Sequence, residues 1–144
     1  SYCLMPTHFH LIVRQVSDNG IKTYLSNVAN SFTRYFNVLH KRKGPLFLPR
    51  FQSREIVTDD VLLHVSRYIH LNPYTGKLVA SEQDLLSYPW SSLQYYISRE
   101  HTHFVETDTL LEFFKNKKSY EKFVFDQRDY QRSLDELKYA DKWL

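Results

Sequence analysis

Two histidines separated by a single residue, His8 and His10, are the side chains with the clearest potential for chemistry. They lie in a run typical of a β-strand, in which successive side chains point to opposite faces. We therefore expect both imidazoles to project from one face, about 7 Å apart along the backbone. Two imidazoles on one face make half of a divalent-metal site, so a second element must supply further ligands and a nucleophile.

The second element is expected in the sequence RYIHLNP, which covers residues 67–73. His64, Tyr68 and Asn72 are spaced i, i+4 and i+8, so they occupy roughly one face of a helix. A phenol with a pKa near 10 is a poor nucleophile at neutral pH, but a nearby divalent cation polarises a phosphoryl group and favours the phenolate. Structural roles stay open at this point: packing for the histidines and Tyr68, and a helix C-cap for Asn72.

The elements in front of this helix follow from residue patterns. Residues 2–5 and 9–14 are expected to be two strands around a tight Pro6-Thr7 connection, or one long strand broken there. Helical spacing begins at Ile21, with Gly44 as its stop, and residues 47–57 are β-like.

The next helix is expected to begin at Thr58-Asp59-Asp60 and to end near Asn72, because the residue before a proline avoids the α region. A short helix through residue 97 and small amphipathic helices within 107–115 and 119–143 follow. The buried stripe of the helix at 58–72 is predicted to be Val61, Leu62, Val65 and Ile69.

This order is strand, strand, helix, strand, helix and a helical tail. The first residues already resemble the middle of a strand, so we expect a preceding strand and helix to be missing from this chain. Restoring them gives an α+β, ferredoxin-like (RRM-like) βαββαβ sheet with helices on one face. The expected domains are a catalytic domain at 1–97 and a helical extension at 98–144.

Composition excludes several classes of protein. The 144 residues suffice for one domain, and a single cysteine excludes an intramolecular disulfide. No apolar run approaches the roughly 20 residues of a membrane span and no signal peptide is evident, so we expect a cytoplasmic protein without a membrane partner.

Charge is unevenly distributed along the chain. The net charge is +3, but residues 1–79 carry +6 and residues 80–144 carry −3, which predicts a polyanion partner for the front part. The candidates for binding such a polyanion are cations interleaved with Phe47 and Phe51, since phosphate neutralisation and aromatic stacking hold single-stranded nucleic acids. The alternative is a solvated helix end followed by a strand. These cations are Lys41, Arg42, Lys43, Arg50 and Arg54, and Arg67 beside Tyr68 could contact a phosphate that Tyr68 would attack.

The motifs resemble those of a known family. Residues 2–13, YCLMPTHFHLIV, resemble the HUH motif (His, bulky hydrophobe, His) of single-tyrosine insertion-sequence transposases. The sequences RYIHLNP at 67–73, GKLV at 76–79 and YPWSS at 88–92 are similar to the REP-associated tyrosine transposase branch in particular. The resemblance covers about residues 1–97, and residues 104–125 look like the short helical extension of that branch.

The resemblance implies a DNA nicking and strand-transfer enzyme that acts on single-stranded DNA, often beside a hairpin. Its tyrosine forms a 5′-phosphotyrosine link and frees a 3′-OH, with help from Mg²⁺ or Mn²⁺. Carried over to this chain, Tyr68 is the nucleophile, His8 and His10 are metal ligands, and Asn72 is the third ligand. The branch acts as a monomer, whereas other relatives exchange helices in a homodimer.

Some features depart from the family or lie outside its pattern. Thr7 stands where Asn or Asp usually precedes the first histidine. His64 could be a proton relay or an auxiliary ligand, and His70 a packing residue or a DNA contact. Tyr88 and Trp90 could stack a base or pin the tail helix to the core.

Two rival functions stay open. One is a catalytically inactive single-stranded or hairpin DNA-binding module of the same fold. The other is a hydrolytic metallonuclease in which Tyr68 is structural.

Overall fold

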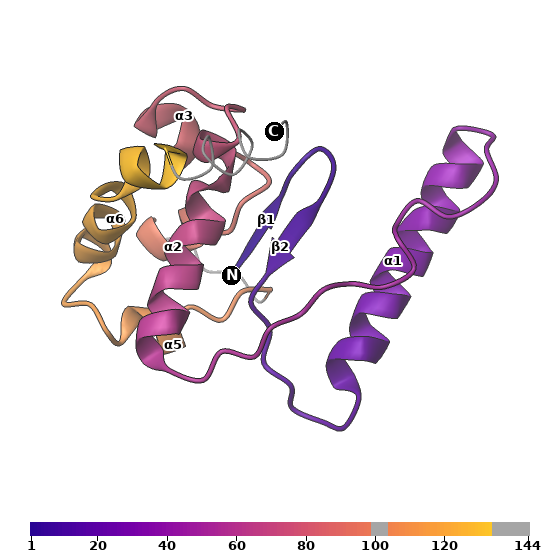
Figure 1. Cartoon of the computed structure of the whole chain (residues 1–144), viewed down its shortest axis with the longest axis horizontal. Coiled ribbons are helices and arrows are strands. Elements are labelled where there is room, and N and C mark those ends of the chain that lie inside the picture. The colour runs from indigo at the N-terminus through magenta and orange to yellow at the C-terminus, as the bar shows by residue number, and fades with distance from the viewer. Residues whose placement is uncertain (99–103, 134–144) are drawn as a thin grey trace, which may run out of the picture. The chain divides into compact units, whose positions relative to one another are not determined.

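The computed structural model describes residues 1–98 and 104–133, and these residues form a mixed α+β structure (Figure 1). A two-stranded antiparallel sheet and six helices occur among them, and residues 128–133 are also helical. In chain order the elements are β1 (Tyr2–Leu4), β2 (Phe9–Leu11), α1 (Gly20–Leu39), α2 (Asp59–Thr75), α3 (Glu82–Leu86), α4 (Leu93–Ile97), α5 (Asp108–Leu111) and α6 (Lys117–Phe125).

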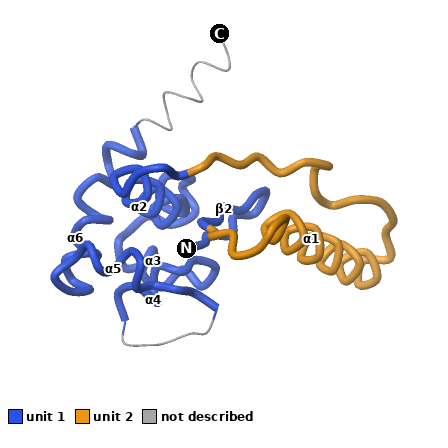
Figure 2. Tube along the Cα trace, turned by 90° about the horizontal axis from the view of Figure 1, so that it is seen from below, with its two compact units in different colours: residues 1–12, 56–144 blue, residues 13–55 orange. Residues whose placement is uncertain are grey.

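The chain divides into two compact units (Figure 2). One unit combines residues 1–12 with the part of the chain that begins at residue 56, and the other consists of residues 13–55. The expected domain boundary at residue 97 does not coincide with either unit and stays a prediction.

The first unit begins with a β-hairpin. Tyr2 lies opposite Leu11 and Cys3 opposite His10, and the Met5 amide donates to the His8 carbonyl at 2.8 Å to close the Pro6-Thr7 turn. Of the two arrangements considered, two strands around this turn are therefore present. The second strand is shorter than predicted, because it ends at Leu11 instead of residue 14.

The segment before α4 runs along the free edge of β1. The Leu4 amide donates to the Trp90 carbonyl at 2.8 Å, and the Ser92 amide donates to the Tyr2 carbonyl at 2.9 Å. Cys3 and Ser91 form an isolated antiparallel bridge between these two bonds. The edge is thus paired over a few residues, which fixes β1 beside α4.

Helix α2 begins as predicted and ends later than predicted. The Thr58 hydroxyl accepts from the Val61 amide at 3.3 Å, and Asp59 and Asp60 lie in the first turn, where the helix dipole favours them. The expected end near Asn72 is wrong, since Pro73 lies inside the helix. A proline in the last turn removes a single amide donor. The helix continues beyond Pro73, and the Gly76 amide donates to the Asn72 carbonyl at its end.

The core gathers around the C-terminal half of α2, where α4 and α6 pack. The predicted stripe is therefore only partly correct: Ile69 is buried, whereas Val61 is 41% exposed. Periodicity finds the apolar face of a helix but does not show which of its turns will be covered. The largest fully buried side chains of the core include Tyr96, Tyr120, Leu71, Leu85, Leu93, His70 and Val124.

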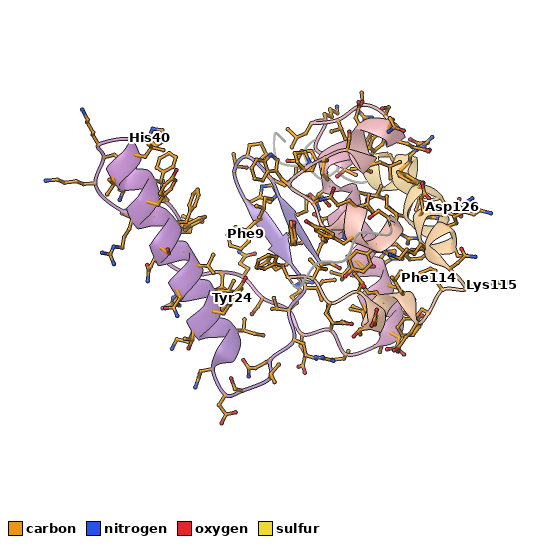
Figure 3. All side chains as sticks on the ribbon, turned by 180° about the vertical axis from the view of Figure 1, so that it is seen from behind. Phe9, Tyr24, His40, Phe114, Lys115 and Asp126 are labelled. Carbon is orange, nitrogen blue, oxygen red and sulfur yellow. The ribbon has the colours of Figure 1, made fainter. Side chains whose placement is uncertain are left out.

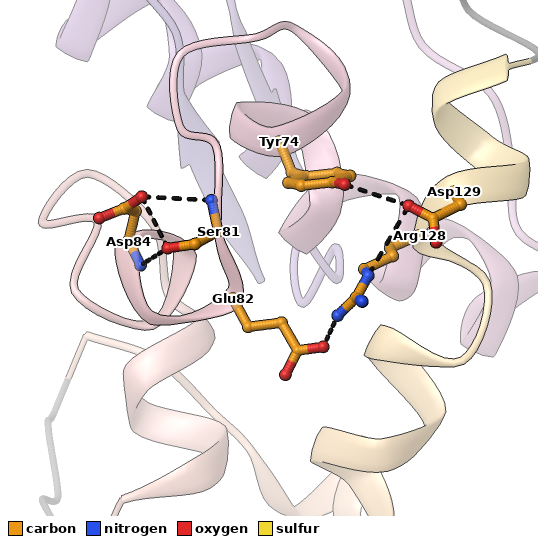
Figure 4. Close-up of polar contacts among 6 residues, drawn as sticks. All are labelled: Tyr74, Ser81, Glu82, Asp84, Arg128 and Asp129. Atoms are coloured by element: carbon orange, nitrogen blue, oxygen red, sulfur yellow. Dashed lines mark hydrogen bonds and ion pairs between the residues drawn. The ribbon is translucent and has the colours of Figure 1, made fainter.

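Helix α3 was not predicted. Its N-terminus has a capping box, in which the Ser81 hydroxyl accepts from the Asp84 amide and the Asp84 carboxylate accepts from the Ser81 amide (Figure 4). Arg128 forms an ion pair with Glu82, and the Tyr74 hydroxyl donates to the Asp129 carboxylate at 3.1 Å (Figure 4). These bonds tie the helical residues 128–133 to α2 and α3.

The predicted tail helices are present in part, as α5, α6 and the helical residues 128–133. The remainder of the predicted range, residues 134–143, lies outside the described residues.

The second unit is built around α1, which matches the predicted helix but ends before Gly44. Lys41 adopts a left-handed conformation with φ of 50°, and the chain turns there. The β-like prediction for residues 47–57 is wrong, because no strand forms there. Pro45 and Pro49 lack amide donors, and nearly all side chains from 47 to 57 are exposed, so neither a ladder nor a buried face organises this stretch.

Within the described residues, no helix combines the length and the apolar character that crossing a membrane requires.

Candidate functional site

The hairpin presents His8 and His10 on the face that packs against α2. Cys3 lies directly opposite His10 in the ladder, so the two side chains share a face, and Cys3 is fully buried. The His8 and His10 rings are 4.9 Å apart between centroids and nearly perpendicular, at 87°. The strand geometry predicted from the His-Phe-His spacing is therefore present.

Tyr68 of α2 lies next to this pair. Its ring centroid is 5.5 Å from that of His10, at an interplanar angle of 82°, and its side chain is half-buried. Helix α2 and strand β1 are in contact, as the hairpin beside α2 in Figure 1 shows. Tyr68 and His10 are thus neighbours in space, although they lie 58 positions apart in the sequence.

Asn72 lies one turn beyond Tyr68 and is only 4% exposed. Its side-chain amide nitrogen donates to the Tyr68 carbonyl at 3.1 Å. The carboxamide is therefore anchored to the turn that carries the candidate nucleophile, and its role as a third metal ligand stays a prediction.

His8 and His10 lie close enough, at 4.9 Å between ring centroids, that both imidazoles would be ligands of one divalent cation. Thr7 Oγ1 lies 3.1 Å from His8 Nδ1. A hydrogen bond to one ring nitrogen orients an imidazole, and the other nitrogen, Nε2, would then be the one to bind a metal ion. Among residues 1–98 and 104–133, no three His, Cys, Asp or Glu side chains come together as a ligand group.

His64 and Arg67 pair with each other on α2. The Arg67 Nη2 donor lies 2.8 Å from His64 Nδ1, and the guanidinium carbon lies 4.5 Å from the Phe123 ring centroid of α6. Burial lowers the pKa of Arg67 from its usual value. Arg67 is thus packed against the tail helix, and its expected contact with the scissile phosphate stays a prediction, as does the auxiliary role of His64.

His70 is a packing residue, which is one of the two roles expected for it. It is fully buried, its Nδ1 lies 2.8 Å from the Tyr120 hydroxyl, and its Nε2 lies 2.8 Å from the Ser92 hydroxyl. Burial lowers the pKa of His70 from 6.5 to about 3, so the imidazole is neutral at physiological pH. A direct DNA contact does not fit a side chain without exposed surface.

The aromatic residues of the YPWSS motif have different environments. The Tyr88 hydroxyl donates to the Leu4 carbonyl at 2.9 Å, so Tyr88 holds the end of β1. The Trp90 side chain is 59% exposed and therefore does not pin the tail to the core. Stacking of a base on Trp90 stays a prediction.

The predicted DNA-binding cations other than Arg67 all lie in the unit of residues 13–55. Arg42 is anchored there, since Nη1 donates to Asn37 Oδ1 at 2.9 Å and Nη2 donates to the Pro45 carbonyl at 3.3 Å. The other four are exposed: Lys41, Lys43, Arg50 and Arg54.

One contact at the site was not anticipated. The Gln131 side-chain amide donates to the Tyr68 carbonyl at 3.2 Å, which links the helical residues 128–133 to the turn of the candidate nucleophile. No spacing or motif marks this glutamine in the sequence, because the contact joins residues 63 positions apart.

No family model, curated protein or solved structure matches this chain.

Proposed function

We propose that this chain is a metal-dependent, single-stranded DNA endonuclease and strand transferase of the HUH single-tyrosine class. The observation that carries the proposal is the approach of three rings: the Tyr68 ring centroid lies 5.5 Å from that of His10, and the His10 centroid lies 4.9 Å from that of His8. Its proposed partner is single-stranded or hairpin DNA.

Tyr68 performs the covalent step in this proposal. Its phenol oxygen attacks the phosphorus, a Tyr–O–P bond forms to the 5′ side, and the bond from phosphorus to the 3′ oxygen breaks. The phenol loses its proton and the departing 3′ oxygen gains one. The reverse reaction, with a 3′-OH from another strand, releases Tyr68 and joins the new strands without a nucleotide cofactor.

His8 and His10 would hold the cation, Mg²⁺ or Mn²⁺, with Asn72 as a third ligand from α2. When bound, the cation supplies charge that polarises the phosphoryl group and stabilises the phenolate. The protein contributes a fixed site, because the hairpin turn and the hydrogen bonds of β1 to residues 90–92 hold the two imidazoles in place.

The ferredoxin-like arrangement belongs to the same proposal. The strand pair at the histidines corresponds to the two adjacent strands of the proposed βαββαβ order, and α2, which carries the tyrosine, comes after the stretch 47–57, where the expected last strand does not form. The packing of α2 against the histidine face of the hairpin supports it.

The test is a covalent adduct with a DNA oligonucleotide in Mn²⁺, resolved on a denaturing gel. We expect a shifted band that chelation with EDTA removes. Tyr68→Phe removes the nucleophile and should remove the band, as should the double variant His8→Ala, His10→Ala. Tyr130→Phe is the matched control, because it deletes the hydroxyl of a phenol that is 62% exposed and should leave the adduct. An undiminished adduct in Tyr68→Phe would reject the assignment.

A second candidate function is a DNA-binding module of the same fold without chemistry. The burial of Asn72 favours it, because a carboxamide that is only 4% exposed is poorly accessible to a cation. Tight oligonucleotide binding without adduct or cleavage in Mg²⁺ or Mn²⁺ would identify this module. Cleavage that leaves a free 5′-phosphate and no adduct would instead indicate hydrolysis by a metal-activated water.

A further inference from the structure

Helix α1 has two contrasting long faces. One is apolar and includes Tyr24, Val28, Phe32 and Tyr35 (Tyr24 is labelled in Figure 3). The other carries a strip of exposed hydrogen-bonding side chains, which we call the polar strip and which consists of Thr23, Asn27, Asn30, Ser31 and Arg34. Four of these, from Asn27 to Arg34, line an open depression of about 300 Å³.

The polar face of α1 lacks the acidic residues that a helix face exposed only to water commonly carries. Such faces commonly carry acidic and basic residues in alternation, because opposite charges three or four positions apart stabilise the helix. Between residues 19 and 54 there is no Asp or Glu, whereas there are seven Lys and Arg residues. The unit of residues 13–55 therefore carries a net charge of +6 in a chain of +3, which favours an anionic partner.

The cationic residues adjoin the polar strip at its C-terminal end. Asn37 continues the strip one turn after Arg34, and its Oδ1 accepts from Arg42 while its Nδ2 donates to the Gly44 carbonyl at 2.8 Å. These bonds fold the loop with Lys41 and Lys43 back onto this side of α1. The polar strip spans about 16 Å from Thr23 to Arg34, with exposed ammonium groups beyond its end.

We propose that the polar strip contacts base edges in the major groove of duplex DNA, while Lys41 and Lys43 bind the adjoining phosphates. The major groove of B-DNA admits an α-helix, Asn pairs with adenine and Arg with guanine through two hydrogen bonds, and the deep, narrow major groove of RNA duplexes excludes side chains. The inference deepens the proposed function, whose partner is single-stranded or hairpin DNA, because it assigns recognition of a duplex stem to the polar strip of α1. It rests on the proposed function only in naming DNA.

The test uses the full chain in EDTA, so that binding is measured without cleavage. Hairpins with randomised stems are selected for binding, and the affinity for the selected stem and a scrambled stem is measured by fluorescence anisotropy. We expect a preference of at least tenfold for the selected stem. Asn27→Ala and Asn30→Ala should each weaken binding of the selected stem about 5- to 150-fold and leave the scrambled stem unchanged. Lys41→Ala should weaken both stems alike.

The variants are designed to keep the fold, because alanine is the best helix former and both positions are exposed. Circular dichroism checks this, and Gln83→Ala, an exposed amide on α3, is the matched control. The proposal is overturned if selection yields no preferred stem, if the preference survives both Asn variants, or if an RNA duplex of the same sequence binds as well. The covalent adduct with single-stranded DNA is a separate readout, so failure here is distinct from failure of the proposed function.

Discussion

Asn72 connects the candidate chemistry to the packing of α2. Its side-chain amide is bonded to the Tyr68 carbonyl, and it is nearly inaccessible to solvent. A carboxamide has an oxygen and a nitrogen, so the same residue can stabilise the helix through Nδ2 and offer Oδ1 to a cation. These two roles have different experimental consequences.

We expect Asn72→Ala to raise the Mn²⁺ concentration for half-maximal adduct formation by about tenfold or more, because a lost ligand that contributes 1.4 kcal/mol changes affinity tenfold. Adduct yield is measured across a Mn²⁺ titration. Thr75→Val is the control, since it removes another helix-backbone hydrogen bond, from Thr75 Oγ1 to the Asn72 carbonyl, and no candidate ligand. An unchanged Mn²⁺ midpoint in Asn72→Ala would exclude Asn72 as a ligand.

His70 should make the stability of the protein depend on pH. Burial lowers its pKa in the folded protein to about 3, whereas the unfolded chain keeps a value near 6.5. Between these values the unfolded state binds more protons, so stability is complete above pH 6.5 and falls as the pH drops, by about 1.4 kcal/mol per pH unit.

His70→Gln removes this titration, so urea unfolding of the variant should show a shallower loss of stability between pH 6.5 and 4 than the wild type. Gln83→Ala is the control, because it removes an exposed side chain that does not titrate, and it should leave the pH dependence unchanged. Parallel curves for wild type and His70→Gln would contradict a neutral, buried His70.

At the scale of elements, α2 and α6 are joined by a buried polar contact. The Tyr120 hydroxyl lies 2.8 Å from His70 Nδ1 and donates to Ser66 Oγ at 3.4 Å. Burial raises the pKa of Tyr120, so its hydroxyl stays protonated. The Ser92 hydroxyl lies within hydrogen-bond distance of the other His70 nitrogen, Nε2, and also accepts from the Tyr2 amide of β1. The hydrogen-bonded network therefore extends from α6 through α2 to the hairpin.

Tyr120→Phe should lower the free energy of unfolding by about 1–3 kcal/mol, because it leaves a buried imidazole nitrogen without its partner. Chemical denaturation measures this loss. Tyr130→Phe removes a hydroxyl from a side chain that is 62% exposed and should have little effect. Equal stabilities of the two variants would show that the hydroxyl of Tyr120 does not join the helices.

At the scale of the whole molecule, charge is segregated between the units. Residues 13–55 carry +6 and the rest of the chain carries −3. Binding to single-stranded DNA should therefore weaken steeply as the salt concentration rises. The double variant Lys41→Ala, Lys43→Ala should make the slope of log K, the binding constant, against log salt shallower by about 1.4, because each lost phosphate contact removes about 0.7.

The matched double variant Lys115→Ala, Lys118→Ala removes two exposed cations from the other unit (Lys115 is labelled in Figure 3). Its salt slope should equal that of the wild type. If both double variants lower the slope equally, DNA binding does not depend on the local charge of residues 13–55.

The local features of this protein follow from its sequence. Alternation along a strand placed His8 and His10 on one face, Thr58 and the acidic residues after it marked the start of α2, and apolar spacing located α1. Each of these rests on backbone geometry within about twenty residues, which the local sequence encodes directly.

Tertiary structure alone decided which turns are buried and which distant residues meet. It left the β-like residues 47–57 without a strand, continued α2 past Pro73, and buried His70 between Tyr120 and Ser92. It also bonded Gln131 to the Tyr68 carbonyl, whereas the approach of Tyr68 to His10 was expected from the motifs. Such contacts depend on the packing of elements far apart in the chain, and residue spacing carries no information about that packing.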